Sequence, residues 1–288
     1  MLDFEFLEPD SVAEASRLVG ELGDDCRVIA GGTALMLAMR QRMLTPTHLV
    51  SVAHLPGLRT ITADGQGWLR IGALCTHAEV AGSPLIRAQW PMLASMASRM
   101  ANPQVRHQGT LGGNLCYADP ATDPPGCLLA LDAQVVLARG RGERVLPLCD
   151  FLVDYYTTAL QGDELLTEIR VPPLPEAASG LYTRHLRTAA EHRPLVSVAL
   201  LVRHQGAACT EARIAIGAST PIPTRVPRAE AYLAGRTVTR QVAAEAAAIV
   251  AADITPVDDA RGSADYRRHI VQVVARRSIA QLFGLQEP

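Results

Sequence analysis

The first 55 residues switch between helical and strand-like patterns of apolar side chains. Apolar residues recur at helical spacing from Val12 to Leu22, and the run ends at Gly23. A short β-branched run at 27–30 then leads into Gly31-Gly32, and residues 33–40 are rich in the helix formers Ala, Leu and Met. The pattern predicts a helix followed by a strand, a tight glycine turn and a second helix.

The middle of the chain mixes short strands with helices. Residues 91–100 favour a helix that stops near Asn102-Pro103, because the residue before a proline avoids helical geometry. Prolines and small residues cluster from Pro172 to Gly180, and we place the main domain boundary there. Apolar runs that are typical of strands occur at 49–52, 68–71, 133–137 and 166–171.

The last third of the chain has strands first and helices afterwards. Strand patterns at 196–202 and 212–216 precede two helical patterns, 241–253 and 263–283, whose predicted N-caps are Thr239 and Ser263. This order predicts the α+β class rather than a wound parallel sheet.

The basic residues of the chain exclude several kinds of enzyme. Of the 288 residues, 27 are basic, and all of these are Arg because the sequence contains no Lys. Schiff-base enzymes, Walker-A nucleotide hydrolases and protein kinases need a lysine amine at the reacting centre. With 29 acidic residues and a formal charge of −2, the chain also lacks the basic excess that nucleic-acid binding requires.

The sequence also indicates where the protein is located and which state its cysteines have. No uninterrupted apolar run approaches roughly 18 residues, so we expect no transmembrane segment. The acidic start, with Asp3 and Glu5, does not resemble a signal peptide, and we expect a cytoplasmic protein. The 6 Cys are dispersed without a C-x-x-C pair, which predicts free thiols and no metal on this chain.

Two glycine pairs are the sharpest local features. Ala30-Gly31-Gly32-Thr33-Ala34 and Thr110-Leu111-Gly112-Gly113-Asn114 each place two residues without Cβ beside a predicted helix start. Such a turn lets the backbone approach a ligand, and free N–H groups at the helix start suit a phosphate or pyrophosphate. Each pair alone is weak evidence, because most such pairs are only turns. Neither pair is the G-x-G-x-x-G fingerprint of a dinucleotide-binding Rossmann unit.

The second pair lies in a segment, 103–125, that is dense in Gly, Pro, Asn, Asp and Thr. We expect this segment to be a long polar loop, and such loops in compact domains are usually functional or disordered. Apolar runs on both sides argue against disorder. Polar groups in an ordered loop need partners, which a large polar cofactor would supply.

The two glycine pairs together resemble the flavin-binding subunit of the molybdenum hydroxylase family, which includes xanthine dehydrogenase and carbon monoxide dehydrogenase. Those subunits carry A-G-G-[TQH]-x-L near residue 30 and a [TS]-[IL]-G-G-N segment near residue 110, and both occur here in order. Three other stretches also look like the family: 71–80, 164–169 and 261–267. The resemblance covers nearly the whole chain.

The resemblance implies a VAO/PCMH-type FAD-binding fold. Two α/β subdomains, 1–55 and 56–173, would be followed by a smaller C-terminal α+β domain of the CO dehydrogenase flavoprotein type, 177–288. The residues implied to bind FAD are Ala30, Gly31, Gly32, Thr33, Ala34, Leu35, Thr110, Gly112, Gly113, Asn114, Asp123, Leu166 and Arg184.

These residues would have different roles. The two glycine segments would form the pyrophosphate loops, with Ala30 at the entrance of the first. Asp123 would accept hydrogen bonds from the ribose or adenylate part, and Leu166 would pack near the flavin ring. Arg184 stands where many members have Lys; either it supports the flavin as a fixed charge, or it is a solvated arginine at the end of a strand.

The function implied by the resemblance is electron transfer within a complex. The chain would be the medium subunit of a heterotrimeric molybdenum hydroxylase, taking electrons from a small partner subunit with two [2Fe-2S] clusters and passing them to an external acceptor. A large partner would hold the molybdopterin (Mo) site, and two heterotrimers would form a dimer. No residue of this chain is expected to be catalytic by itself.

Two other functions remain open at this point. One is a self-sufficient FAD-dependent oxidoreductase with its own substrate site, for which the sequence shows no catalytic acid or base. The other is a binding or scaffold module whose glycine pairs are only turns.

Overall fold

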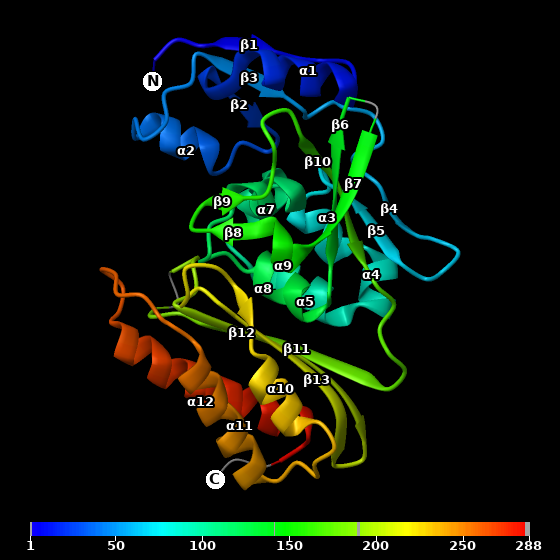
Figure 1. Cartoon of the computed structure of the whole chain (residues 1–288), viewed down its shortest axis with the longest axis vertical. Coiled ribbons are helices and arrows are strands. Elements are labelled where there is room, and N and C mark those ends of the chain that lie inside the picture. Colours follow the sequence, from blue (N-terminus) through cyan, green and yellow to red (C-terminus); the bar gives the residue numbers. More distant parts are fainter. Residues whose placement is uncertain (1, 141, 189–190, 286–288) are drawn as a thin grey trace.

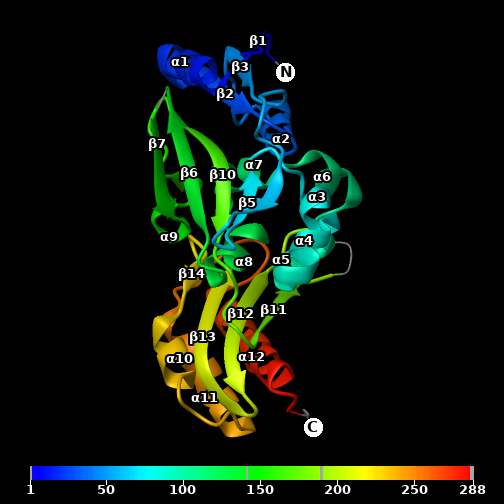
Figure 2. The same ribbon diagram turned by 90° about the vertical axis from the view of Figure 1, so that its right-hand side faces the viewer.

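The computed structural model describes residues 2–140, 142–188 and 191–285. Three units follow one another along the chain and along the long axis of the molecule (Figure 1), with the N-terminal unit at one end and the C-terminal unit at the other. In the perpendicular view the second unit lies between the other two (Figure 2).

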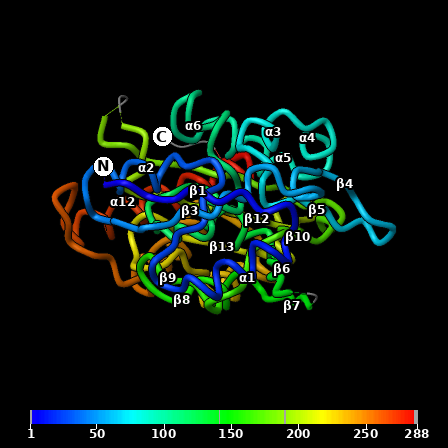
Figure 3. Tube along the Cα trace, turned by 90° about the horizontal axis from the view of Figure 1, so that it is seen from above, coloured from blue at the N-terminus to red at the C-terminus, as the bar shows by residue number. Residues whose placement is uncertain are grey.

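The N-terminal unit is a parallel sheet with the strand order β1-β3-β2. Helix α1 begins at its N-cap Ser11, whose hydroxyl accepts a hydrogen bond from the Glu14 N–H, and it packs its apolar side on this sheet. Seen from above (Figure 3), this unit lies across the end of the molecule. Its elements are β1 (Glu5–Leu7), α1 (Val12–Leu22), a 3₁₀ turn (Gly23–Asp25), β2 (Cys26–Ile29), α2 (Leu35–Arg40) and β3 (His48–Ser51).

The second unit is an antiparallel sheet with the strand order β4-β5-β10-β6-β7, packed against short helices. Its strands are β4 (Ile61–Ala63), β5 (Leu69–Gly72), β6 (Gln134–Arg139), β7 (Gly142–Pro147) and β10 (Leu165–Val171), with a small hairpin of β8 (Leu152–Asp154) and β9 (Thr157–Thr158). Its helices are α3 (His77–Gly82), α4 (Pro84–Gln89), α5 (Pro91–Arg99), α6 (Pro103–Gln108), α7 (Leu111–Tyr117), α8 (Pro124–Ala130) and α9 (Leu148–Phe151).

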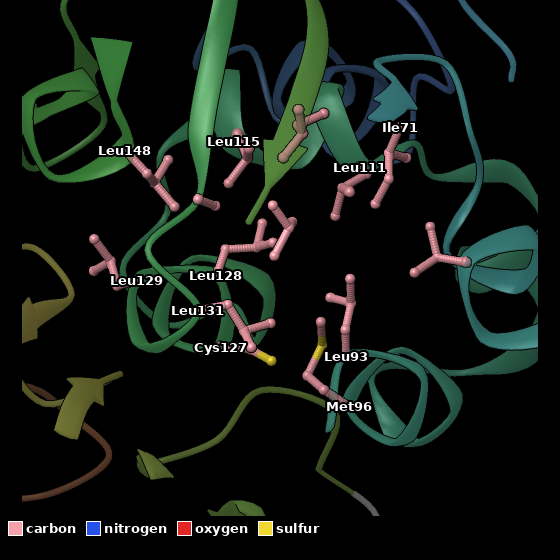
Figure 4. Close-up of a cluster of buried hydrophobic side chains, with 14 of the residues drawn as sticks. Ile71, Leu93, Met96, Leu111, Leu115, Cys127, Leu128, Leu129, Leu131 and Leu148 are labelled. Carbon is pink, nitrogen blue, oxygen red and sulfur yellow. The ribbon is translucent and has the colours of Figure 1, made fainter. Parts of the chain in front are cut away.

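Helices α5, α7 and α8 share one core with this sheet. Leu93 and Met96 of α5 point toward the same interior as Leu111 and Leu115 of α7 and Leu128 of α8 (Figure 4). All five side chains are almost completely buried. Burying a leucine contributes about 1.5–3 kcal/mol, so this core fixes α7, which carries the second glycine pair, firmly beneath the sheet.

The C-terminal unit is an antiparallel sheet with the order β11-β12-β13-β14, covered by helices. Its elements are β11 (Ala178–His185), β12 (Val196–Gln205), β13 (Ala208–Gly217), β14 (Thr224–Arg225), α10 (Pro227–Leu233), α11 (Arg240–Asp253) and α12 (Ala264–Leu282). Thr239 and Ser263 cap α11 and α12 as predicted. The α+β class is therefore confirmed.

The prediction of a long loop over 103–125 is wrong. Helices α6 and α7 occupy most of this segment, and α8 begins within it. The side chains of Asn102 and Thr110 cap α6 and α7, and prolines fill the first positions of α6 and α8. The same residues that break long helices start short ones, because a cap or a first-turn proline satisfies a helix N-terminus.

Candidate functional site

The first glycine pair forms a loop between β2 and α2. Gly32 has φ +69°, in the left-handed region that favours glycine, and the chain turns there into α2. The N–H groups of the five consecutive residues from Gly31 to Leu35 donate no hydrogen bond to any described residue. These residues are only partly exposed. A row of unpaired N–H groups at a turn is a binding site for an anion such as phosphate.

The second glycine pair lies inside α7, and its N–H groups are already paired. The N–H groups of Leu111 and Gly112 donate to the carbonyl oxygens of Cys75 and Ala73, respectively, and each N···O distance is 2.9 Å. The Gly113 N–H donates to Thr110 Oγ1 over 3.1 Å. The expectation of free N–H groups at this pair is therefore wrong. In the folded chain, segment 73–77 pairs with 109–112 and accepts hydrogen bonds from backbone N–H groups that we expected to be free.

The glycines of the second pair serve close packing. A methyl group at Gly112 would lie 2.6 Å from the Ala73 Cβ and 2.8 Å from the Ala73 carbonyl oxygen. A methyl group at Gly113 would meet the Thr110 hydroxyl at 2.7 Å. Only a residue without Cβ lets α7 approach segment 73–77 this closely.

The two glycine segments meet at one place in the fold. A methyl group at Gly31 would lie 2.0 Å from the Gln108 carbonyl oxygen and 3.0 Å from the Gly109 Cα. One at Gly113 would lie 3.7 Å from the Ala30 Cβ. Residues 30–35 and 109–114 thus line one junction between the N-terminal unit and the second unit, which we call the loop junction.

His77 is a residue of the loop junction that the sequence interpretation missed. Its N–H donates to the Gly109 carbonyl oxygen over 3.1 Å. Its ring carbon Cδ2 and the Thr33 Oγ1 both lie 3.3 Å from the point where a Gly109 methyl group would stand. The side chain is buried, Nδ1 has no hydrogen-bond partner, and burial lowers the pKa of His77 to about 4. A neutral imidazole therefore lies beneath both segments; only the three-dimensional contacts reveal it.

Asn114 lies in α7, and Asp123 is the residue before the first turn of α8. The Asn114 side chain lies 3.1 Å from the Thr122 hydroxyl. Asp123 is buried, and its Oδ1 accepts a hydrogen bond from the Tyr182 hydroxyl over 2.8 Å. Burial raises the pKa of the Asp123 carboxyl to about 6, although Arg184 and Tyr182 lower it. The contact of Asp123 with a ribose stays a prediction.

Arg184 ties the C-terminal unit to the second unit. Its guanidinium donates to the carbonyl oxygens of Arg99 and His192 over 2.5 and 2.6 Å, and its Nε lies 3.5 Å from Asp123 Oδ1. The side chain is only 11% exposed, so the interpretation as a solvated arginine is wrong. One planar guanidinium hydrogen-bonds to two carbonyl oxygens and also lies beside a carboxylate here, which a single lysine amine matches poorly. Its contact with a flavin stays a prediction.

Leu166 lies on β10, in the core that the sheet shares with α7. It pairs in register with Leu137 of β6 and is 8% exposed. It belongs to the same apolar cluster as Leu111 and Leu115. The position suits an apolar wall, and its contact with a flavin ring stays a prediction.

The loop junction fits a dinucleotide better than it fits acid and base catalysis. The five unpaired N–H groups of 31–35 suit an anionic group, and Thr33 and Asn114 add neutral polar side chains to the two segments. Within the described ranges, no group of three or more His, Cys, Asp or Glu residues could hold a metal ion. Nor does any helix in those ranges have the length and apolar character to span a membrane.

Comparison with known proteins follows the same division of the chain. Residues 2–174 match the model of the FAD binding domain in molybdopterin dehydrogenase, and residues 182–282 match that of the CO dehydrogenase flavoprotein C-terminal domain.

Similar proteins match along nearly their whole length. The 6-hydroxypseudooxynicotine dehydrogenase complex subunit alpha of Paenarthrobacter nicotinovorans is 34% identical over 99% of this chain and 96% of its own. The carbon monoxide dehydrogenase medium chain of Hydrogenophaga pseudoflava is 32% identical over 96% of each chain. A solved structure of the carbon monoxide dehydrogenase from that organism, in a form that lacks the Mo-pyranopterin moiety of the molybdenum cofactor, superposes with a TM-score of 0.93 at 33% identity, over 96% of each chain.

Proposed function

The chain belongs to the family of FAD-binding medium subunits of molybdenum hydroxylases, and we propose that it carries electrons within such a complex from a small [2Fe-2S] subunit to an external acceptor. Its relatives are dehydrogenase and hydroxylase subunits. Bound FAD would supply the chemistry, since a flavin can accept electrons singly and release them in pairs.

The unpaired N–H groups of 31–35 are the observation that carries this proposal. They would hold the pyrophosphate of FAD, because these five consecutive N–H groups at the loop junction have no acceptor among the described residues. Gly31 keeps this cradle against the backbone of Gln108 and Gly109, so the second unit forms its far wall. The protein's part is to bind and orient the dinucleotide at the boundary between two units.

The remaining site residues would hold the other parts of the dinucleotide. We propose that Asn114 and Asp123 face its polar groups and that Leu166 and Arg184 lie toward the flavin. Arg184 cannot lose its proton, so it would contribute a fixed positive charge. Asp123 and Tyr182 hold the neighbouring part of β11 through their own hydrogen bond.

The partners follow from the family. We propose a large subunit that holds the molybdopterin cofactor and hydroxylates the substrate, and a small subunit with two [2Fe-2S] clusters. Two such heterotrimers would form the complete complex in the cytoplasm. The similar Hydrogenophaga structure is described as lacking the Mo-pyranopterin moiety of its molybdenum cofactor, and the mention of this cofactor supports the proposal of a molybdopterin-binding partner.

We also propose that the units 1–55, 56–173 and 177–288 are the structural domains. Three apolar clusters support this division, one centred on each unit. The clusters interlock at their edges, since Tyr182 of β11 packs into the core of the second unit. Limited proteolysis should cut first between residues 172 and 177, where β10 has ended and β11 has not begun.

The test is to purify the chain together with its co-expressed partner subunits. We expect a stoichiometric content of FAD, two partner chains, and reduction of the flavin when substrate is added to the complex but not to the isolated chain. Turnover of a small organic substrate by the isolated chain would instead favour a self-sufficient oxidoreductase. Absence of flavin from the carefully isolated complex would refute the proposal.

A further inference from the structure

The Asn114 side chain is held from behind by a turn of the second unit. Thr122 Oγ1 lies 3.1 Å from Asn114 Oδ1 and 2.9 Å from the carbonyl oxygen of Asp119. The Thr122 N–H donates to the same Asp119 carbonyl oxygen over 3.1 Å. One hydroxyl therefore faces two groups, both of which are placed as acceptors.

A threonine hydroxyl carries one hydrogen and cannot donate to both groups. The Asp119 carbonyl oxygen can only accept a hydrogen bond. It lies closer to the Thr122 hydroxyl than Asn114 Oδ1 does, so we assign the hydroxyl hydrogen to this carbonyl oxygen. The Asn114 amide is different, since its oxygen and nitrogen can exchange places by a half-turn and are assigned from the surrounding hydrogen bonds. All three groups are satisfied when Asn114 turns its NH₂ toward Thr122.

We propose that Thr122 is a positioning residue that turns the Asn114 amide so that its Oδ1 faces the cofactor side of α7 as a hydrogen-bond acceptor. The inference rests on the proposed function and deepens it. Asn114 would then accept from a hydroxyl or a ring N–H of the dinucleotide. It would not donate to a phosphate, which leaves that task to the loop 31–35.

The turn behind Thr122 is rigid enough to fix this arrangement. The Asp119 side chain is buried, and its Oδ1 accepts a hydrogen bond from the Ala121 N–H over 3.0 Å. Its other oxygen, Oδ2, pairs with the guanidinium of Arg193, which comes from the C-terminal unit. Because two partners hold the buried Asp119 carboxylate, the backbone carbonyl oxygen of the same residue stays in place. A series of contacts therefore leads from the Arg193 guanidinium to Asp119, and from Asp119 through the Thr122 hydroxyl to the Asn114 amide.

The sequence makes a direct test possible, because Asn102 and Asn114 are its two asparagines. Selective ¹⁵N labelling of asparagine in the full chain gives two side-chain NH₂ groups in an NMR spectrum. Asn102→Asp identifies one of them, and it should preserve the cap of α6 because aspartate is an equally good N-cap.

In the FAD-free chain, we expect one Asn114 NH₂ proton to exchange slowly with solvent. Thr122→Val should shift this signal and abolish the slow exchange, while Thr122→Ser should preserve both. Insensitivity of the Asn114 signals to Thr122→Val would overturn the proposal, because it would place Oδ1 toward Thr122.

A titration with FAD completes the test. Thr122→Val should weaken FAD binding about fivefold, the size of one neutral hydrogen bond, while Thr122→Ser should stay near the wild type. Equal affinity in wild type and Thr122→Val would also overturn the proposal. A wild-type chain that binds no FAD would refute the proposed function itself, and the NMR result would still report on the orientation of Asn114.

Discussion

The two glycine pairs look alike in the sequence but differ in their surroundings in the structure. At 31–35 the backbone donors are unpaired, and Gly32 adopts a left-handed conformation. At 111–114 the N–H groups donate to acceptors of Ala73, Cys75 and Thr110, and the glycines lie within a helix. The unpaired donors of the first pair suit an anion, whereas the glycines of the second pair let α7 pack closely against segment 73–77.

The difference shows how one motif type can supply either donors or space. A glycine removes a Cβ in both cases, but the neighbours decide which consequence matters. Segment 73–77 pairs with the second glycine segment and uses its N–H groups. No strand or segment of the described chain pairs with 31–35 in this way. Substitutions at the two pairs should therefore fail in different ways.

Replacing Gly31 should have the largest effect on the cofactor. A methyl group there would stand 2.0 Å from the Gln108 carbonyl oxygen, so the two segments must separate. Overpacking of this kind costs up to about 3 kcal/mol, and we expect Gly31→Ala to weaken FAD binding about a hundredfold. Gly112→Ala, which clashes with Ala73, should instead lower the stability of the second unit. Thermal unfolding and FAD titration of both variants distinguish the two effects; similar losses in both assays would contradict the comparison.

Acidic pH should act on the second segment through His77. The pKa of His77 is lowered to about 4 by burial, against 6.5 for the ordinary side chain. Below about pH 6.5 the unfolded chain binds a proton that the folded chain refuses, so stability falls as the pH drops toward 4, by at most about 3 kcal/mol. Urea unfolding at several pH values measures this slope, and His77→Phe should remove it.

Asp123 should oppose that slope over part of the range. The pKa of its carboxyl is raised to about 6, so the folded chain takes up this proton first and gains stability as the pH falls from 6 toward 4. In the variant Asp123→Asn the loss of stability at acidic pH should therefore be steeper than in the wild type. If the dependence of stability on pH is the same in this variant and in the wild type, burial does not raise the pKa of the Asp123 carboxyl, contrary to what the structure indicates.

Gly32 tests the backbone conformation of the cradle. Its φ of +69° costs an alanine about 1 kcal/mol, and distortion of the N–H groups should weaken FAD binding about tenfold. Gly57→Ala is the matched control, since Gly57 has φ +79° and no neighbour within 4 Å. Both variants should lose similar stability, but only Gly32→Ala should lose FAD affinity. Equal FAD affinity in both variants would mean that the cradle tolerates the change.

Thr110→Ala should have the smallest effect on FAD and gives the sharpest test of the second pair. It removes the cap that accepts from the Gly113 N–H, at a cost of about 1 kcal/mol in stability. FAD affinity should fall by less than about fivefold. If the second pair were a phosphate site, freeing this N–H group would strengthen FAD binding. Thr110→Ser keeps the cap and should resemble the wild type in both assays.

Much of the fold could be predicted from local patterns. The helix 12–22 and the strand before Gly31 were predictable because periodicity and caps act within a few residues. Segment 103–125 was not, because its caps and prolines are equally compatible with a loop and with short helices. Burial of Leu111 and Leu115 against α5 decides in favour of helices.

The sequence by itself determined the class of the chain, the family resemblance and the two segments at the loop junction, since these depend on residue identity and order. Only the tertiary structure decided which donors are free, because hydrogen bonds between 73–77 and 109–112 join residues more than thirty positions apart. It also revealed the contacts of His77, Thr122 and Tyr182 with the site residues, which the local sequence patterns did not indicate. Their roles depend on neighbours that the chain acquires by folding.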